Sequence, residues 1–557
     1  MLDLPTSQSD GEASTRRQSH DIQGSTEMFD PSEGYNELKR REINDEQDKK
    51  ELGFDDWSSS HTTAAADSYP GLSMQDKKSF ALLVTLYLLQ GIPVGLASGS
   101  IPFLLKSKLS YGQIGIFSLA SYPYSLKLLW SPIVDATYSK SIGRRKSWII
   151  PIQILMGSLL LWLGLHIDEM FTNEKLDVTT LTFLFFTLIF LSATQDIAVD
   201  GWALTLLSKP NLSYASTAQT VGLNTGYFLS FTVLLAFHSA EFSNKYFRSE
   251  PKDEGILQLG TYLVFWAFVY FAVTIWLIFG KAEERTQHDD DMMDVKSVYT
   301  TIWNICKLPH MKNFILVMLL AKIGFIANEN VTGLKLLEKG FNREDLALTV
   351  LIDFPFQIIF GYYAAKWSSG PQPLNPWLKA FYGRLAFAVT GMLIILAFPK
   401  DGVVSTGYFF LVIASTVFNS FMSTVQFVSI SAFFTTIADP VIGGTYMTLL
   451  ATFSNFGGTW PRFFVLGAVD YFTEATCSVP DADNTVLNCV GEQEKAMCKD
   501  NGGICTIERD GYYVVSMICI ILGALTLFGF VRPQVKNLQR LEVKKWSLYG
   551  HRSRRGS

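Results

Sequence analysis

The sequence lacks the short motifs that mark the common enzyme classes. It contains no G-x-S-x-G nucleophile turn, no P-loop and no H-E-x-x-H metal motif. Its 7 histidines lie in tails, in loops or at the ends of apolar runs, so none is expected to act as a base deep in a core. No basic stripe with interleaved aromatic residues suggests nucleic-acid binding, and the net charge is only −5. We therefore expect no enzyme activity, no cofactor and no nucleic-acid partner.

Long apolar runs dominate the 557 residues, of which 48% are hydrophobic. A run of about 18 or more apolar residues is long enough to cross a bilayer as a helix. Twelve such runs are present, six on each side of a charged stretch. They lie near 79–104, 111–132, 147–167, 178–207, 216–238, 258–280, 311–330, 344–366, 379–398, 405–428, 441–469 and 511–531. The pattern predicts an all-α membrane protein of twelve transmembrane helices, in which two six-helix bundles form a major facilitator fold.

The polar segments predict the topology. Residues 1–78 are rich in Ser, Asp and Glu and predict a disordered cytosolic tail. The N-terminal bundle at 79–280 and the C-terminal bundle at 311–531 are joined by a cytosolic linker at 281–310, and a basic tail follows at 532–557. The positive-inside rule places the segments rich in Lys and Arg, and with them both termini, in the cytosol. These cations include Lys77, Lys78, Lys140, Arg144, Arg145, Lys146, Arg532 and Lys536.

Four of the 6 cysteines lie in one loop at 470–510, between the last two apolar runs. With a cytosolic C-terminus this loop faces the lumen, where disulfides persist. Cys477, Cys489, Cys498 and Cys505 allow three pairings, and the sequence does not choose among them. The alternatives are free thiols or a metal site, but the spacings match no C-x-x-C zinc pattern. We expect lumenal disulfides and no metal.

One apolar run ends in a polar stripe. Ser192, Asp196 and Asp200 recur every four residues, so they share one face of a helix. An ionised carboxylate in hydrocarbon costs about 2.5–3.5 kcal/mol on insertion scales. The stripe must therefore face a protein interior or a water-filled cavity, and it predicts a transport pathway.

The turn after the second run carries a candidate latch. Asp135 precedes a glycine turn that leads into Arg144 and Arg145, and a carboxylate with paired arginines can join neighbouring helices through charge-assisted hydrogen bonds. We predict a gate made by these three residues, with Asp200 as a further partner. The alternative is that the arginines only fix the topology.

Cations also occur inside the apolar runs. Lys127 and Arg384 lie toward the ends of theirs, where long side chains can reach water. Lys322 lies about midway along its run and cannot easily do so. It is expected to pair with a buried carboxylate, such as Glu329 or Asp353, or to meet an anionic substrate.

Several stretches together resemble the eukaryotic acetyl-coenzyme A transporter family. They are YLLQGIP (87–93), SLKLLW (125–130), GRRKSW (143–148), ATQDIAVDGWAL (193–204), TGLKL (332–336), GPQPLN (370–375) and DPVIGGTYMTLL (439–450). The resemblance covers roughly 79–531. It implies a multi-pass carrier of the endoplasmic reticulum membrane that moves acetyl-CoA from cytosol to lumen for lumenal acetylation. It also implies kinship with bacterial muropeptide permeases.

Acetyl-CoA has three phosphate groups, so its carrier needs cations and an aromatic or apolar wall for the adenine. The candidate substrate-binding residues are Lys127, Lys322, Arg384, Gln90, Trp202 and Tyr446. Asp196 and Asp200 would repel phosphate, and we assign them to gating or to proton coupling. CoA is a possible exchange substrate, and the oligomeric state, including a homodimer, stays open.

Two other functions remain as alternatives. The first is a carrier for another anionic solute, such as glutathione disulfide, a peptide or a muropeptide-like compound. The second is a membrane-embedded acetyltransferase, which the absence of a deep base disfavours.

Overall fold

The structure is a computed structural model that describes a large part of the chain. The chain divides into two units, Met1–Gly71 and Leu72–Ser557, and the described residues all belong to the second. They are residues 73–139, 141–172, 177–208, 211, 213–280, 283, 295–368, 372–399, 402–438, 443–478 and 487–546. The expected tail up to residue 72, Lys140, most of 281–294 and the last residues from 547 lie outside the described part.

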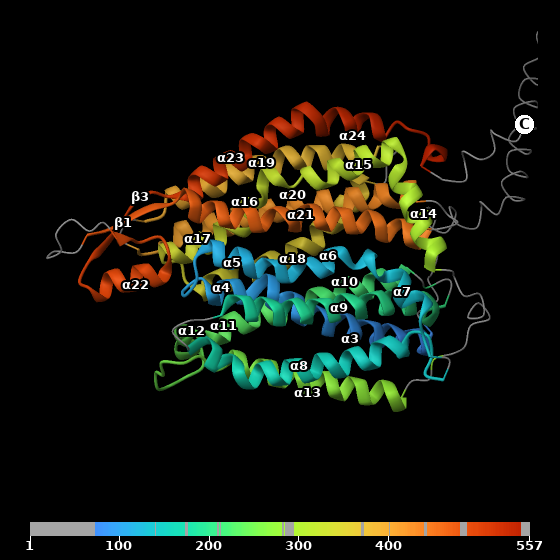
Figure 1. Cartoon of the computed structure of the whole chain (residues 1–557), viewed down its shortest axis with the longest axis horizontal. Coiled ribbons are helices and arrows are strands. Elements are labelled where there is room, and N and C mark those ends of the chain that lie inside the picture. Colours follow the sequence, from blue (N-terminus) through green and yellow to red (C-terminus); the bar gives the residue numbers. More distant parts are fainter. Residues whose placement is uncertain are drawn as a thin grey trace, which may run out of the picture. The chain divides into compact units, whose positions relative to one another are not determined.

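Helices that run roughly parallel to one another form most of this unit (Figure 1). The N-half contains α3 (Met74–Gly95), η1 (Leu96–Ser100), α4 (Ile101–Leu105), α5 (Tyr111–Ser118), η2 (Leu119–Ser121), α6 (Tyr122–Leu126), η3 (Lys127–Leu129), α7 (Ser131–Ala136), α8 (Lys146–Thr172), α9 (Val178–Leu206), α10 (Ser213–Phe228), η5 (Leu229–Val233), α11 (Leu234–His238), α12 (Ala240–Tyr246) and α13 (Leu259–Gly280). After α14 (Val295–Lys307), the C-half contains α15 (Pro309–Leu320), η7 (Ile323–Phe325), α16 (Ile326–Asn330), α17 (Thr332–Lys339), α18 (Arg343–Ser368), α19 (Leu374–Leu396), α20 (Thr406–Ile437), α21 (Gly443–Phe472), α23 (Gly511–Thr526), η8 (Leu527–Val531), α24 (Arg532–Leu538) and η9 (Val543–Lys545).

Ten helical segments in the described residues are long and apolar enough to cross a membrane. They account for ten of the twelve expected spans. The other two expected spans, 111–132 and 441–469, correspond to the chain from α5 to α7 and to α21. The structure therefore supports a multi-pass membrane protein, while the count of twelve stays a prediction.

Two of the expected continuous helices are broken. The span expected at 111–132 is divided into α5, α6 and α7 by the short helices η2 and η3, and Pro123 and Pro132, which lack an N–H, stand in the first turns of α6 and α7. The span expected at 311–330 is interrupted at Lys322, after α15 and before η7. Hydropathy does not register such breaks, so the sequence predicted the two spans but not their interruptions.

The two halves share their largest core at one end of the helices. We name the end that carries residues 473–478 and 487–510 the loop end, and the end at which α14 crosses the bundle the linker end (Figure 1). Buried residues near the loop end form one cluster with members from both halves, such as Leu105, Ile114, Leu334 and Leu466. At the linker end each half has its own main cluster. The halves are thus held together most extensively at the loop end.

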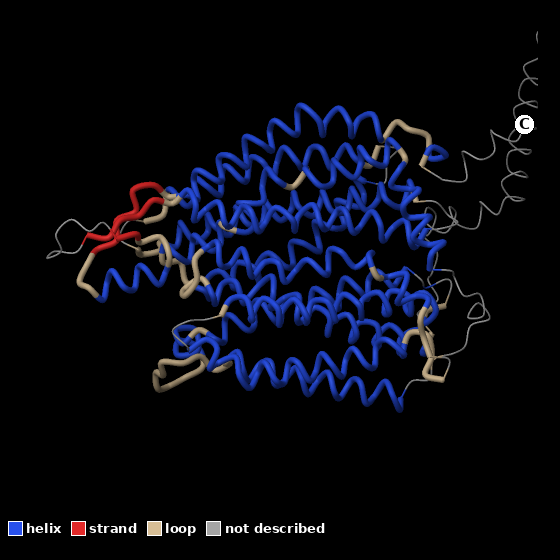
Figure 2. Tube along the Cα trace, viewed as in Figure 1, coloured by secondary structure: helices blue, strands red, loops and turns tan. Residues whose placement is uncertain are grey.

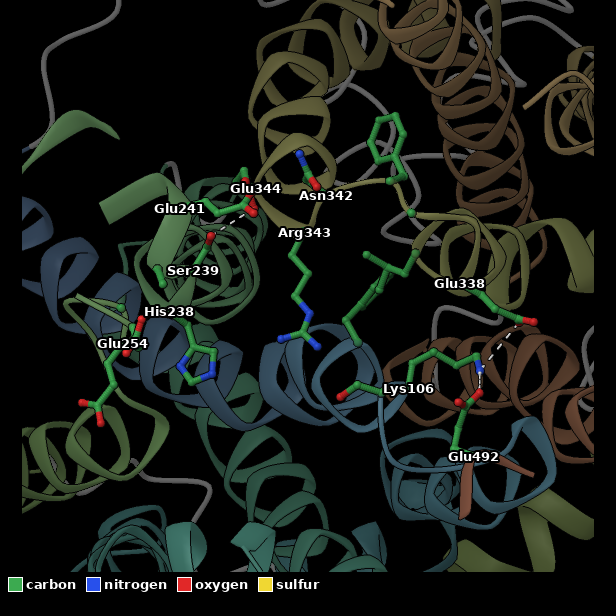
Figure 3. Close-up of a pocket in the computed structure, with 18 of the residues that line it drawn as sticks. Lys106, His238, Ser239, Glu241, Glu254, Glu338, Asn342, Arg343, Glu344 and Glu492 are labelled. Carbon is green, nitrogen blue, oxygen red and sulfur yellow. Dashed lines mark hydrogen bonds and ion pairs between the residues drawn. The ribbon is translucent and has the colours of Figure 1, made fainter. Parts of the chain in front are cut away.

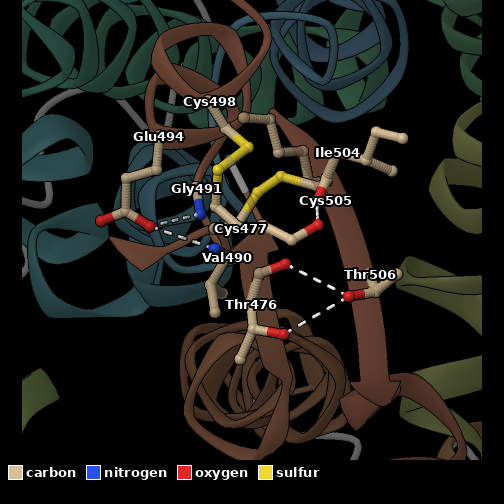
Figure 4. The surroundings of a disulfide bond; sticks show 12 residues. Thr476, Cys477, Val490, Gly491, Glu494, Cys498, Ile504, Cys505 and Thr506 are labelled. Atoms are coloured by element: carbon tan, nitrogen blue, oxygen red, sulfur yellow. Dashed lines mark hydrogen bonds between the residues drawn. A yellow bond between two sulfur atoms is a disulfide. The ribbon is translucent and has the colours of Figure 1, made fainter. Parts of the chain in front are cut away.

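A small sheet stands out from the helices at the loop end (Figure 2). Strand β1 (Glu474–Ser478) lies between β2 (Leu487–Asn488) and β3 (Ile504–Arg509), antiparallel to both, and α22 (Glu492–Asp500) packs beside them. The expected all-α fold class holds for the membrane-spanning part, and the sheet lies in the loop between α21 (Gly443–Phe472) and α23 (Gly511–Thr526). Disulfides join Cys477 to Cys498 and Cys489 to Cys505, so strands and helix are stapled together (Figure 4).

Non-reducing peptide mapping is expected to recover these two disulfides from the protein purified in its oxidised state. The reason is geometric. Cys477 of β1 and Cys505 of β3 lie opposite each other in the sheet, Cys477 bonds to Cys498 of α22, and Cys505 bonds to Cys489, which follows β2. Recovery of a Cys477–Cys489 or a Cys477–Cys505 peptide would contradict this arrangement.

The segment expected as a tail at 532–557 begins as part of the fold. Residues 532–546 contain α24 and η9, and Trp546 is fully buried in the core of the C-half. The Tyr446 hydroxyl donates a hydrogen bond to the Trp546 carbonyl oxygen at 3.0 Å. Apolar Val535, Leu538 and Trp546 explain why this charged stretch docks, and the expected tail beyond residue 546 lies outside the described residues.

Candidate functional site

Lys127 lies where its transmembrane segment is broken, and two aspartates of α9 meet it there. Its Nζ contacts an Asp196 carboxylate oxygen in an ion pair and lies 3.4 Å from Oδ2 of Asp200. The ammonium is also 5.6 Å from the ring centre of Tyr124. The aspartate stripe expected from the spacing is therefore real, and it faces the interior of the N-half.

Asp200 has further partners from two other helices. The Tyr87 hydroxyl of α3 donates to its Oδ1 at 2.8 Å, and Nε2 of Gln219 from α10 donates to the same oxygen at 3.0 Å. Its side chain is 39% exposed, whereas that of Asp196 is 0% exposed. Asp200 thus connects the buried ion pair with solvent. We expected Asp200 to be a partner of Arg144 and Arg145, but its contacts in the structure are with Lys127, Tyr87 and Gln219.

Two cations, Lys322 and Arg384, lie close together in the C-half. Lys322 stands at the break between α15 and η7, and Arg384 of α19 lies beside it in the wall of a cavity of about 110 Å³. Arg384 forms an ion pair with Glu329 and donates to Oε1 of Gln426 at 2.7 Å. Its guanidinium carbon lies 3.6 Å from the ring centre of Phe325. Arg384 is therefore neutralised and held in place from three sides.

Lys322 has no carboxylate within ion-pair distance among the described residues. Of the two expected partners, Glu329 pairs with Arg384, and Asp353 accepts a hydrogen bond from Gln357 at 2.7 Å. A Cβ added at Gly458 of α21 would lie 3.2 Å from Nζ of Lys322, so this glycine leaves space for the ammonium. A cation at a helix break, beside a cavity and without a counter-charge, is suited to bind an anion.

A fourth cation, Arg462, lines the space between the halves. Arg462 of α21 and Asn330 of α16 hydrogen bond to each other at a cavity of about 60 Å³. Ser98 of η1 and Ser118 of α5 complete its wall from the N-half. The neighbours of Arg462 come from segments that are distant in the sequence.

The expected latch at the linker end is present as a set of contacts. Nη1 of Arg145 lies 2.6 Å from Oδ1 of Asp135, and Arg144 donates to the Asp135 carbonyl oxygen at 2.9 Å. Glu283 accepts from the backbone N–H of Arg145 at 2.9 Å. The guanidinium of Arg145 also rests on Gly201 of α9, where a Cβ would collide with it. The latch therefore connects α7 and α9 without using Asp200.

The loop end holds a charge network that joins the halves (Figure 3). Nζ of Lys106, at the end of α4, lies 3.0 Å from Glu492 of α22 and 3.7 Å from Glu338 of α17. Glu338 also accepts from the Tyr111 hydroxyl at 2.5 Å. Asp470 of α21 accepts from the backbone N–H of Tyr111 at 3.1 Å and so caps α5. These contacts hold the loop end closed.

Further cations surround Glu338 within the C-half. Lys335 lies 3.1 Å from Glu338 and 2.7 Å from Asp510, and Lys495 lies 3.8 Å from Glu338. Sequence reasoning missed this network. Its only local signal was the Lys335–Glu338 spacing of three residues on one helix face.

A cavity of about 810 Å³ opens beside this network. Figure 3 shows Arg343, His238 and Glu344 on its far wall. Ser239 donates to Glu344 at 3.1 Å. A hydrogen bond with Glu344 and its negative charge raise the pKa of Glu241 above its ordinary value. The cavity is polar and carries charges of both signs.

Three of the expected substrate-binding residues lie elsewhere. Trp202 is 2% exposed in the core of the N-half, and Tyr446 is 0% exposed in that of the C-half, so neither ring face can stack on a ligand in this structure. Both rings pack in these cores. Gln90 is fully buried in the N-half, and its amide has no hydrogen-bond partner among the described residues.

Comparison with known proteins gives one family over most of the chain. A protein-family profile described as Acetyl-coenzyme A transporter 1 matches residues 79–288, 281–375 and 371–548. An uncharacterized membrane protein of Saccharomyces cerevisiae is 45% identical over 549 residues, covering 85% of this chain and 98% of that protein. The Anhydromuropeptide permease of Escherichia coli K12 is 28% identical over 151 residues, 27% of this chain and 30% of the permease.

Solved transporter structures share the fold. A bacterial homologue of the human lysosomal transporter Spinster, inward-facing and unoccupied, has a TM-score of 0.55 at 14% identity and covers 85% of this chain and 100% of its own. A D-xylose-proton symporter has a TM-score of 0.53 at 11% identity and covers 83% of this chain and 99% of its own. The expected major facilitator fold is confirmed.

Proposed function

Because this membrane transporter belongs to the acetyl-coenzyme A transporter family, we propose that it carries acetyl-CoA from the cytosol into the lumen of the endoplasmic reticulum. The transport works by alternating access, in which the halves close at one end and open at the other. We place both termini and α14 in the cytosol and the disulfide-bonded loop in the lumen, where its disulfides persist.

The observation that carries the proposal is Lys322. It stands at a helix break, lines a cavity beside Arg384, and has no carboxylate partner among the described residues. Half-helix ends near the midplane form the substrate sites of many transporters, and an ammonium there suits a phosphate. Arg462 adds a cation at the space between the halves. We assign Lys322 and Arg384 to substrate binding, and the Asp135–Arg145 contact to gating.

Purified protein in liposomes tests the cargo. A carrier accumulates intact labelled acetyl-CoA inside the vesicles, whereas a membrane-embedded acetyltransferase supplied with an amine acceptor transfers the acetyl group to it and releases free CoA. Counterflow into vesicles preloaded with CoA tests exchange. The partial similarity to an Anhydromuropeptide permease makes a muropeptide-like anion the second candidate cargo. Uptake of such a compound without uptake of acetyl-CoA would overturn the proposal.

Lys322→Ala is expected to lower acetyl-CoA uptake at least tenfold while the protein stays folded. A hydrogen bond between an ammonium and a phosphate contributes about 1.5–3 kcal/mol, which corresponds to roughly ten- to hundredfold. Lys312→Ala is the matched control, because Lys312 lies on the same helix α15 and is exposed. Equal uptake by the two variants would remove Lys322 from the binding site.

A further inference from the structure

Gln426 of α20 stands beside Lys322 and Arg384 in the wall of the cavity of about 110 Å³. Its Oε1 accepts the hydrogen bond from Nη1 of Arg384 at 2.7 Å. Because an arginine side chain can only donate, this contact determines which end of the amide faces Arg384. The amide nitrogen Nε2 is the other end, and it has no hydrogen-bond partner among the described residues although Gln426 is only 6% exposed.

Arg384 also has a donor to spare. Its Nη1 is used by Gln426 and its Nη2 by Glu329, but its Nε has no partner in the part of the chain that the structure describes. A buried donor without an acceptor is unfavourable, and an acceptor placed in the cavity would relieve it. Two buried N–H groups and the ammonium of Lys322 thus meet at one cavity with no acceptor of their own.

An unpaired amide nitrogen alone does not mark a binding site. Gln153 of α8 is fully buried, its Oε1 accepts from the Thr274 hydroxyl at 3.0 Å, and its Nε2 is likewise without a partner among the described residues. Gln153 is not among the residues that line the three cavities described above. What distinguishes Gln426 is the cavity and the two cations that share it.

The cavity lies within one half of the protein. All the residues that line it belong to the C-half, from α15, η7, α19, α20 and α21. Its volume is well below the roughly 300–1,000 Å³ of a pocket that holds a whole drug-sized ligand. It is therefore a side pocket that can take one end group of a larger cargo.

We propose that this side pocket binds a terminal phosphate monoester of the cargo and that Gln426 is a specificity-determining residue for it. The inference rests on the proposed function, because it takes the cargo to be acetyl-CoA. Two of the three phosphates of acetyl-CoA form a diphosphate in the middle of the molecule, and the third stands alone on the 3′ position of the ribose. A phosphate monoester offers three acceptor oxygens, which match the donors of Lys322, Arg384 and Gln426. The acetyl end is neutral and would leave Lys322 without an anion.

The first test changes the ligand and leaves the protein as it is. Acetyl-dephospho-CoA lacks only the 3′-phosphate, and its binding to the full-length protein in detergent is compared with that of acetyl-CoA by titration calorimetry. We expect acetyl-dephospho-CoA to bind at least about tenfold more weakly, because the charged hydrogen bonds of the side pocket are left unmade.

The second test assigns the difference to Gln426. Gln426→Leu removes the amide and keeps a similar size, so it is expected to weaken the binding of acetyl-CoA about tenfold and that of acetyl-dephospho-CoA much less. Gln153→Leu is the matched control, since it removes a buried amide with an unpaired Nε2 outside the side pocket. It is expected to leave the ratio of the two affinities unchanged. Thermal unfolding of each variant shows whether it is folded.

The outcomes separate this inference from the cargo. If the protein with its natural sequence binds both ligands equally, the side pocket does not bind the monoester, while the proposed cargo stands. If Gln426→Leu is folded and discriminates between the ligands as before, Gln426 does not determine the specificity and the inference is wrong. If the natural sequence does not bind acetyl-CoA at all, the cargo is wrong and the inference falls with it.

Discussion

Glu338→Gln is expected to open the loop end of the transporter. Glu338 lies within 3.8 Å of Lys106, Lys335 and Lys495, and it accepts a hydrogen bond from Tyr111. An amide in its place leaves three cations close together with less counter-charge. Truncating one partner of a buried charge pair costs about 2–5 kcal/mol, so a closed state held by this network loses at least tenfold in population.

Thiol labelling can measure this opening. Ser118 is buried in α5 beneath the network and is close in size to cysteine. In a background that carries Cys306→Ser, the Ser118→Cys thiol is expected to react with a maleimide at least about tenfold faster when Glu338→Gln is also present, in line with the shift in population. The other free cysteine, Cys519, is buried and serves as an internal reference.

A second ion pair of the same region is the control. Glu474 and Arg509 pair at 2.5 Å within the small sheet, and both are largely exposed. Since this pair does not join the halves, Glu474→Gln is expected to leave the labelling rate unchanged. Equal acceleration by the two variants would mean that the sheet, and not the contact between the halves, controls access.

Local patterns in the sequence predicted the features whose partners lie close in the chain. The Asp135–Arg145 contact joins residues separated by ten positions, and Asp196 and Asp200 share a face because the helix repeats every 3.6 residues. Long apolar runs likewise predicted the membrane helices, because burial in lipid requires apolar side chains whatever the neighbouring helices are.

The features that the sequence missed depend on distant segments or on the backbone. Lys106 meets Glu492 across 386 positions, and no pattern along the chain could pair them. Lys127 was visible as a cation, but its aspartate partners became evident only in the fold. Hydropathy treated Lys322 as a residue in a regular helix, because it averages side chains and does not register where backbone hydrogen bonds end.

Gly226→Ala is expected to prevent stable folding. Gly226 of α10 and Gly91 of α3 stand where the two helices touch, and a Cβ at 226 would collide with the Leu88 carbonyl oxygen and lie 2.8 Å from Cα of Gly91. Overpacked side chains usually cost about 1–3 kcal/mol because they can shift. Here the obstructing atoms belong to the backbone, so we expect a loss above that range and little monodisperse protein after extraction.

The same contact between α3 and α10 positions the hydrogen-bond donors of Asp200. α3 carries Tyr87 and α10 carries Gln219, and both donate to Asp200, so helices forced apart would also remove these hydrogen bonds. Gly467→Ala in α21 is the control, because a Cβ there meets nothing within 4 Å and alanine favours a helix over glycine. Its melting temperature should equal or exceed that of the natural sequence. If Gly226→Ala melts at the same temperature as this control, the backbones of α3 and α10 do not approach as the structure places them.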